Sequence, residues 1–246
     1  MINNYIKNVS IEYNKIPKND YLYSLPIIKN LSSLNFIKPV TFFIGENGLG
    51  KSTLIEAIAT KWGFNPEGGS INFTFSTKHT ESNLYKYLHL IKGTSRPRSG
   101  YFLRSESLYN VATNIDELDS IECNAPPISD GYGGKSLHNQ SHGESFLSIF
   151  FKRFRNNGLY ILDEPESALS PISQMSLMVR IQQLVNNNSQ FIIATHSPIL
   201  IALPNSQVYE IKKDGIQPMN YRQTEHYSIM KNFFENTDSV INSLLT

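Results

Sequence analysis

The sequence predicts an α/β protein whose central sheet is mainly parallel, and three observations lead to this fold class. Short apolar runs of the kind that form buried strands alternate along the chain with segments of helical spacing. A glycine-rich loop joins one such run to the helix that follows it. Two later runs, 158–165 and 190–198, are continuously apolar, which is typical of strands covered on both faces. Because 246 residues can fill one large core, we expect a single domain over 1–246.

The first half of the chain supplies three predicted strands and one helix. "PVTFFIG" (39–45) is a β-rich run that ends in glycine, and "LIEAIATKWGF" (54–64) follows it with helical spacing. "SINFTFS" (70–76) alternates like a half-buried strand, and "SGYFLRSES" (99–107) is a further strand candidate. The predicted order is therefore strand, glycine-rich loop, helix and then two strands.

A small lobe is expected over about 108–157, between the second group of strands and the apolar run at 158–165. Turn-forming residues collect before 135 and the periodic pattern weakens, so this lobe should be rich in loops, with one helix after Ser141.

Beyond the lobe, the segment 170–185 predicts an amphipathic helix with proline in its first turn. The segment 207–221 predicts an antiparallel hairpin that turns at Asp214-Gly215, and the chain from about 224 is expected to be helical.

Composition narrows the functional classes. The net charge is +1, so no global basic field indicates nucleic acid, although a local basic groove remains possible. Cys123 is the single cysteine, which excludes an intrachain disulfide and a cysteine cluster for zinc. No run approaches the roughly 20 apolar residues of a membrane span, and the first residues lack a signal-peptide core. We therefore expect a cytoplasmic protein that meets a membrane only through a partner.

The loop "GENGLGKS" (45–52) matches the pattern G-x-x-x-x-G-K-[ST] at each defined position. Its glycines allow the backbone to wrap around phosphate groups, and the following helix adds the positive end of its dipole. Lys51 can reach the β- and γ-phosphates, and the Ser52 hydroxyl can bind Mg²⁺. A glycine-rich turn could match by chance, but the strand before it and the helix after it are the context that this loop requires. The predicted nucleotide-binding residues are Gly45, Glu46, Asn47, Gly48, Leu49, Gly50, Lys51, Ser52 and Thr53.

Three further side chains are predicted to meet this loop. In a parallel sheet the carboxyl ends of the strands share one edge, where ligands bind. Asp163 ends a buried strand and could bind Mg²⁺ directly or through water, and the adjacent Glu164 could activate the attacking water. His196 follows the next buried strand and could hydrogen-bond the γ-phosphate or that water, although a lone histidine in this position is usually an ordinary loop residue.

Four segments in this order, "GENGLGKST", "SHGES", "YILDEPESALS" and "IIATHSP", resemble the ABC-type ATPase superfamily. The likeness is greatest to small bacterial ATPases of the branch related to RecF and SMC proteins. It implies a P-loop NTPase fold of ABC-ATPase type, with helices flanking the parallel sheet, an antiparallel β part and a small signature lobe. It also implies ATP and Mg²⁺ as ligands, and a head-to-tail homodimer with two ATP molecules at the interface, each held by the phosphate loop of one subunit and the signature segment of the other.

The signature slot reads Gln140 to Glu144 here. Relative to the transporter sequence LSGGQ, Ser141 and Gly143 are kept, whereas His142 and Glu144 differ. The resemblance implies that this helix start contacts ATP held by the partner. The same residues also form the S-x-x-E pattern of a capping box, and the two roles are compatible.

The sequence departs from the family in two places, and the base-stacking residue is not fixed. Ser170 stands where transport ATPases often have aspartate. The contact that this aspartate makes across the dimer interface is therefore absent here or made by another residue. No glutamine occupies the slot that contacts the metal in many relatives; Arg104 and Glu106 are candidates there, with a structural salt bridge as the alternative. Tyr21 or Tyr23 could stack on adenine.

The resemblance implies an ATPase that dimerises on ATP, opens on hydrolysis and passes this change to a partner protein or nucleic acid, with DNA maintenance or phage defence as the setting. One alternative is an ATP-gated switch that controls an effector nuclease or toxin. A second is the nucleotide-binding subunit of a transporter, against which the altered signature and the missing glutamine argue. Lys51 and Ser141 are only about 90 residues apart, which leaves no room for a long coiled-coil arm.

Overall fold

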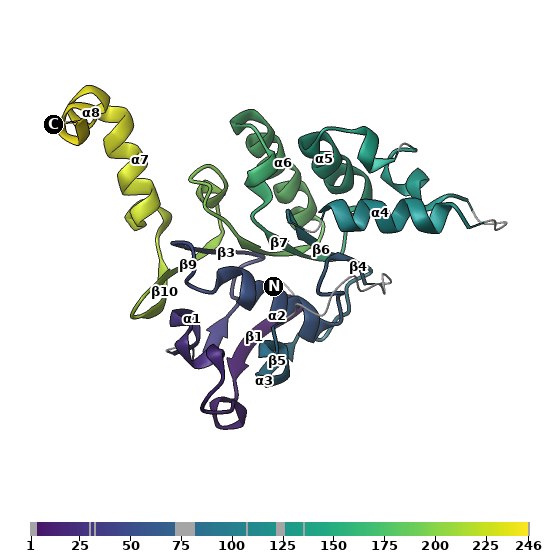
Figure 1. Cartoon of the computed structure of the whole chain (residues 1–246), viewed down its shortest axis with the longest axis horizontal. Helices are drawn as coiled ribbons and strands as arrows, with labels where there is room; N and C mark the ends of the chain where they lie inside the picture. The colour runs from purple at the N-terminus through teal and green to yellow at the C-terminus, as the bar shows by residue number, and fades with distance from the viewer. Residues whose placement is uncertain are drawn as a thin grey trace.

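The computed structural model describes residues 4–29, 31, 33–71, 82–106, 108–121, 126–134 and 136–245, with the side chains of Lys29 and His142 left out. Two sheets organise these residues (Figure 1). A seven-stranded sheet has the order β10-β9-β3-β8-β7-β6-β4, and a three-stranded sheet has the order β2-β1-β5.

The large sheet is parallel through its five central strands and antiparallel at both edges. Its strands are β3 (Val40–Gly45), β4 (Gly69–Ser70), β6 (Ser99–Arg104), β7 (Gly158–Asp163), β8 (Gln190–Ala194), β9 (Gln207–Lys212) and β10 (Gly215–Met219). Pairing is parallel from β9 through β3, β8 and β7 to β6, whereas β10 and β4 pair antiparallel. Each residue of β3, β7 and β8 is buried, as continuous apolar runs predict. The mainly parallel α/β fold is confirmed.

The strand predicted over 70–76 can be followed only in part. Strand β4 covers Gly69–Ser70 and pairs with β6, while residues 72–81 lie outside the described residues. The hairpin predicted at Asp214-Gly215 is present as β9 and β10.

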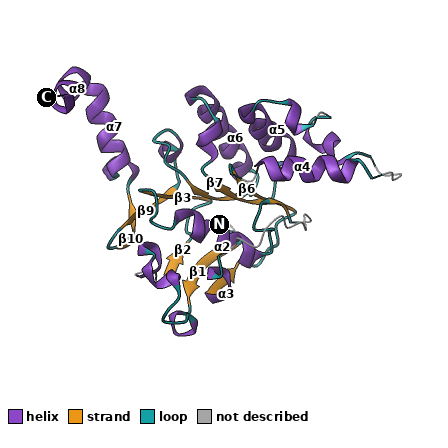
Figure 2. Cartoon of the chain, viewed as in Figure 1, coloured by secondary structure: helices purple, strands orange, loops and turns teal. Residues whose placement is uncertain are grey.

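The small sheet is antiparallel and lies on the same side as the helix after the glycine-rich loop. It consists of β1 (Ile6–Ile11), β2 (Ser33–Asn35) and β5 (Leu88–Lys92). Its buried residues share one hydrophobic cluster with α2 (Lys51–Trp62), and the short helices α1 (Pro26–Lys29) and α3 (Leu84–Tyr87) lie beside it. Figure 2 shows this layer on one face of the large sheet.

The opposite face carries α4 (Leu108–Asp119), α5 (His142–Arg153) and α6 (Pro171–Asn186), which enclose a second hydrophobic cluster (Figure 2). The helix α4 occupies part of the segment where the sequence pattern was expected to weaken into loops. Its buried residues, Leu108, Val111, Ala112 and Ile115, follow helical spacing, so a short amphipathic helix was overlooked among the turn formers.

Short 3₁₀ turns complete the connections, at Tyr13–Lys15, Tyr21–Ser24, Ile128–Tyr132, Leu137–Asn139, Pro165–Ala168, Leu200–Ala202 and Tyr221–Gln223.

The chain ends in a helical arm that projects away from both sheets (Figure 1). It consists of α7 (Glu225–Glu235) and α8 (Thr237–Leu245), and neither helix has a buried residue. Its start is nevertheless anchored, because Thr224 is fully buried and its hydroxyl accepts the Tyr227 N–H as the N-cap. The arm is therefore fixed at one end and exposed along the rest of its length.

Stability should depend on the aromatic cluster beneath α5. Phe154 is fully buried, stacks on Tyr160 with ring centroids 4.1 Å apart and lies 4.5 Å from the ring of Phe150. We expect Phe154→Ala to lower the free energy of unfolding by about 3–5 kcal/mol, because it leaves a cavity. In Phe234→Ala, at a side chain 70% exposed on the arm, the change should stay within about 0.5 kcal/mol. Urea denaturation measures both, and equal effects would contradict this description of the core.

Candidate functional site

The glycine-rich loop lies at the carboxyl end of β3, and close packing accounts for two of its glycines. A Cβ at Gly45 would lie 2.4 Å from the carbonyl oxygen of Ile211 on β9, and one at Gly50 would lie 2.6 Å from Cγ2 of Ile27. Both residues have positive φ, at 145° and 97°. Side chains at these positions would force the loop away from the sheet and from α1.

Lys51 is held inside this loop. Its Nζ donates to the carbonyl oxygens of Gly45 and Glu46, both at 2.8 Å, and the residue is 5% exposed. Burial lowers the pKa of the ammonium, while the carboxylates of Glu164 and Asp163 act in the opposite direction. The loop therefore holds a largely buried cation against two carbonyl oxygens at the start of α2, and a helix start is suited to an anion.

Asp163 meets the loop from the end of β7. Its Oδ1 accepts a hydrogen bond from the Ser52 hydroxyl at 3.1 Å, and the residue is buried. Burial raises the pKa of this carboxyl to about 6, although Arg104 and the Ser52 hydroxyl oppose the shift. The two residues predicted to bind Mg²⁺ thus lie in contact.

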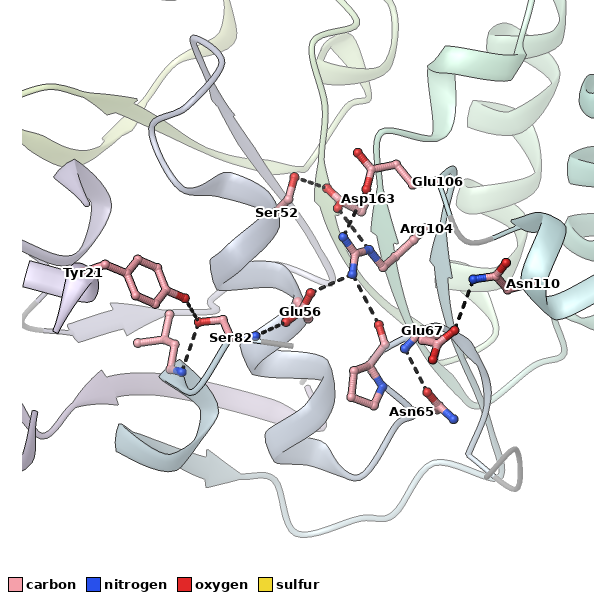
Figure 3. A network of polar contacts seen from close by, with 12 residues as sticks. Tyr21, Ser52, Glu56, Asn65, Glu67, Ser82, Arg104, Glu106, Asn110 and Asp163 are labelled. Carbon is pink, nitrogen blue, oxygen red and sulfur yellow. Dashed lines mark hydrogen bonds and ion pairs between the residues drawn. The ribbon is translucent and has the colours of Figure 1, made fainter. Parts of the chain in front are cut away.

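Arg104 connects this carboxylate to α2, as Figure 3 shows. Its Nη1 lies 2.7 Å from Oε2 of Glu56, and its Nε lies 3.8 Å from Oδ2 of Asp163. The side chains of Arg104 and Glu56 are only 17% and 9% exposed. Between the two roles that the sequence allowed for Arg104, the geometry favours the salt bridge.

Glu106 and the two tyrosine candidates lie at the margin of the site. The Glu106 side chain is 87% exposed and reaches Arg104 at 3.4 Å. The Tyr21 hydroxyl donates to Ser82, at the end of the network in Figure 3, and the Tyr23 hydroxyl donates to the carbonyls of Tyr13 and Ile16. Neither tyrosine lines the cavity beside the phosphate loop.

Glu164 takes a left-handed backbone conformation, with φ 50° and ψ 53°. Its N–H donates to the carbonyl of Ala194 at 2.9 Å, which ties the residue to β8. The carboxylate is 42% exposed, and its Oε1 lies 3.7 Å from Nε2 of His196. The residues predicted to activate water therefore face each other at the sheet edge. Burial lowers the pKa of His196, with Lys51 adding to the shift, which favours the neutral imidazole.

Glu166 is a site residue that the sequence reasoning missed. It accepts hydrogen bonds from the Thr195 hydroxyl, at 2.7 Å, and from the His196 N–H. Burial raises the pKa of its carboxyl, and these hydrogen bonds oppose the shift. Glu166 thus fixes the backbone that presents His196. A third carboxylate within "LDEPES" was the available signal, but it resembled a solvated turn.

The signature segment forms the capping box that its spacing predicts. The Glu144 N–H donates to the Ser141 hydroxyl at 3.3 Å, and Glu144 Oε2 accepts from the Ser141 N–H at 2.9 Å. A Cβ on Gly143 would lie 2.6 Å from the Ala168 carbonyl oxygen, so this glycine also has a packing role. Helix α5 begins at His142, whose side chain lies outside the described part of the chain. Ser170, in the place of the family's aspartate, is the N-cap of α6.

Comparisons with known proteins show what this chain is similar to. A family model described as an AAA domain matches residues 24–124, and one described as an AAA ATPase domain matches residues 135–201. The solved structure of cbiO1 from Clostridium perfringens, part of the ABC transporter complex cbiONQ, has a TM-score of 0.51 and 17% identity over 98% of this chain and 99% of that one. The chain therefore has the α/β P-loop NTPase fold of ABC-ATPase type.

Two further proteins are similar to this chain. The structure of an ATP-binding cassette of an ABC transporter has a TM-score of 0.51 and 16% identity, and covers 96% of this chain and 97% of that one. The nisin transport ATP-binding protein NisT of Lactococcus lactis subsp. lactis is 28% identical over 209 residues, which is 76% of this chain. The chain spans about a third of the length of NisT, since the match covers 33% of that protein.

The region beside the phosphate loop has a pair of residues that fit Mg²⁺. The Ser52 hydroxyl and the Asp163 carboxylate are hard oxygen ligands, and Mg²⁺ is usually held by one or two protein oxygens together with substrate phosphates. The raised pKa of Asp163 indicates that Arg104 and Ser52 do not fully offset the burial of its charge. Within the described ranges there is no cluster of three or more His, Cys, Asp or Glu side chains for a metal. No helix among those residues is long and apolar enough to cross a membrane.

Removal of Arg104 should destabilise the domain, because it leaves the largely buried Glu56 carboxylate without this ion pair. We expect Arg104→Ala to lower the free energy of unfolding by about 3 kcal/mol, and the double variant Arg104→Leu/Glu56→Leu to lower it less. Arg96→Ala, at an exposed arginine, serves as the control, with a change within about 0.5 kcal/mol. Chemical denaturation gives all three values. An Arg104→Ala protein as stable as the control would show that the pair contributes nothing.

Proposed function

We propose that this chain binds Mg-ATP at the phosphate loop and hydrolyses it to ADP and phosphate. The observation that carries the proposal is the convergence of five functional groups at one sheet edge. Ser52 contacts Asp163, Lys51 lies within the loop, and the Glu164 carboxylate faces His196 at 3.7 Å. These groups come from three strand ends, so an accidental glycine-rich turn does not account for them.

Each group has a role in the proposed reaction. Lys51 exchanges its contacts with the loop carbonyls for phosphate oxygens, and the loop N–H groups hold the remaining charge. Ser52 and Asp163 would hold the metal, which supplies charge neutralisation at the phosphates when bound. Glu164 accepts the proton of the water that attacks the γ-phosphorus, and His196 orients that water or the leaving phosphate. Glu166 is a positioning residue that keeps the His196 backbone in place.

Hydrolysis should disappear when the lysine or the carboxylate is removed. We expect Lys51→Ala to lose nucleotide binding and turnover, and Glu164→Gln to keep binding while turnover falls by about 10²-fold or more. Lys15→Ala, which removes an exposed lysine paired with Glu12, should leave both unchanged. Phosphate release and equilibrium binding separate the two effects. Equal turnover in wild type and Lys51→Ala would reject the proposal.

We further propose that two copies associate head to tail on ATP, so that the Ser141 helix start of one copy completes the phosphate site of the other. The support is the exposure of the Ser141–Glu144 capping box at the start of α5, with its positive dipole end turned outward. A serine hydroxyl, a glycine N–H and a helix N-terminus are groups that bind phosphate.

Mixing two inactive variants tests this arrangement. A mixed dimer of Lys51→Ala and Ser141→Arg has one composite site with an intact loop and an intact helix start, so about a quarter of wild-type turnover should return. A mixture of Lys51→Ala with Glu164→Gln is the control: Glu164 acts on the loop of its own chain, so no intact site forms. Phosphate release from equimolar mixtures gives the answer. No recovery in the first mixture, although light scattering detects mixed dimers, would contradict composite sites.

We propose that the chain transmits this cycle to an effector protein or nucleic acid. The exposed apolar residues of the arm support contact with another macromolecule. A second candidate is a transporter subunit, favoured by the named roles of NisT and cbiO1. Capture of the hydrolysis-blocked Glu164→Gln protein with Mg-ATP distinguishes them: recovery of a membrane-spanning partner supports transport, and recovery of a nuclease, another soluble effector or nucleic acid supports the first proposal.

A further inference from the structure

A cavity of about 930 Å³ lies at the mouth of the phosphate loop, and its lining comes from three parts of the chain. One wall is formed by the loop itself and by His196. A second is formed by the end of β9 and the turn after it, residues 210–214. The third is formed by the first turns of the C-terminal helix α7, including His226, Ile229 and Met230. The arm is exposed elsewhere, so this cavity is where it meets the nucleotide-binding region.

The cavity wall on α7 is held in position by buried polar contacts. The Glu225 N–H donates to Oε1 of Glu210 at 3.0 Å, and Glu210 is only 2% exposed on β9, the strand beside the edge strand β10. Its second oxygen lies 3.1 Å from the Lys212 ammonium. Together with the buried N-cap Thr224, these contacts place the next residue, His226, in a defined position beside the loop.

His226 faces the groups that are proposed to handle the γ-phosphate. Its ring centroid lies 5.7 Å from that of His196. Burial lowers the pKa of His226 and the Lys51 ammonium adds to the shift, while the carboxylates of Glu210 and Glu225 oppose it. The neutral imidazole that this favours still has one N–H to donate. Two imidazoles that line one cavity, beside the loop that holds the Lys51 ammonium, are suited to a phosphate oxygen.

We propose that His226 donates a hydrogen bond to the terminal phosphate of bound ATP, so that the C-terminal helix distinguishes ATP from ADP. The inference rests on the proposed nucleotide site. It assigns a phosphate-binding role to a residue outside the phosphate loop, the signature segment and the two strand ends. Because α7 is anchored only at its start, the contact also makes the arm the part of the chain that responds to the third phosphate.

Nucleotide binding to the full chain tests the role of His226. With Mg²⁺ present, His226→Ala should bind a slowly hydrolysed ATP analogue about tenfold or more weakly, while its affinity for ADP changes less than about twofold. His226→Gln, which keeps an N–H donor, should retain most of the preference for the analogue. Lys231→Ala, which removes a cation from α7 outside the cavity, should leave both affinities unchanged.

Two outcomes would overturn the inference. An equal loss for the analogue and for ADP would assign His226 to packing against His196, and no loss for either would remove it from the site. Hydrogen exchange gives a second readout, because residues 225–235 should be protected by the analogue more than by ADP in wild type but not in His226→Ala. Failure of the proposed function is distinguishable, since wild type itself would then bind neither nucleotide.

Discussion

One row of backbone pairing across the large sheet sets the geometry of the whole site. Phe43 pairs with Ala194, Ala194 with Asp163, and Asp163 with Arg104, so β8, β7 and β6 end in register, while β3 runs two residues further. The phosphate loop leaves the sheet two residues after Phe43, and His196 follows two residues after Ala194. A slip of one residue in any of these pairings would turn the functional side chains to the opposite face.

The second constraint is the burial of charge beside that row. Lys51, Glu56, Asp163 and Arg104 are all largely removed from water, and burial is the largest cause of the pKa shifts at Lys51 and Asp163. Partner groups offset the cost only in part: Lys51 uses two backbone carbonyls, and Asp163 a serine hydroxyl and a distant guanidinium. In the proposed function, a triphosphate and its metal ion would give the loop cation and the strand-end carboxylate charged partners in place of these internal ones.

The sequence alone was sufficient to predict the parallel strands and the residues at which these strands end. Continuous apolar runs and a loop with fixed spacing are local signals, and the structure places Ser52 against Asp163 as parallel pairing requires. A salt bridge was one predicted role of Arg104, but its partner Glu56 could not be predicted, because 48 residues separate the two and the helix and strand patterns do not say which side chains meet. The same holds for His226, which looks like an ordinary helical residue until the fold brings α7 to the loop. The apolar residues of α4 recur with helical spacing, but the turn-forming residues nearby obscured this pattern in the sequence.

The close approach of Gly143 to Ala168 has a mechanical consequence. A Cβ on Gly143 would lie only 2.6 Å from the Ala168 carbonyl oxygen, so the two backbones are closely packed. The start of α5 therefore cannot move toward the Pro165–Ala168 turn without displacing that turn. That turn begins one residue after Glu164 and includes Glu166, the residue that braces His196. In the proposed dimer, the start of α5 would contact the nucleotide of the neighbouring copy, while Glu164 would act on the nucleotide of its own chain. Because these two parts are in contact through the turn, they would move together, and events at the two nucleotide sites would be coupled.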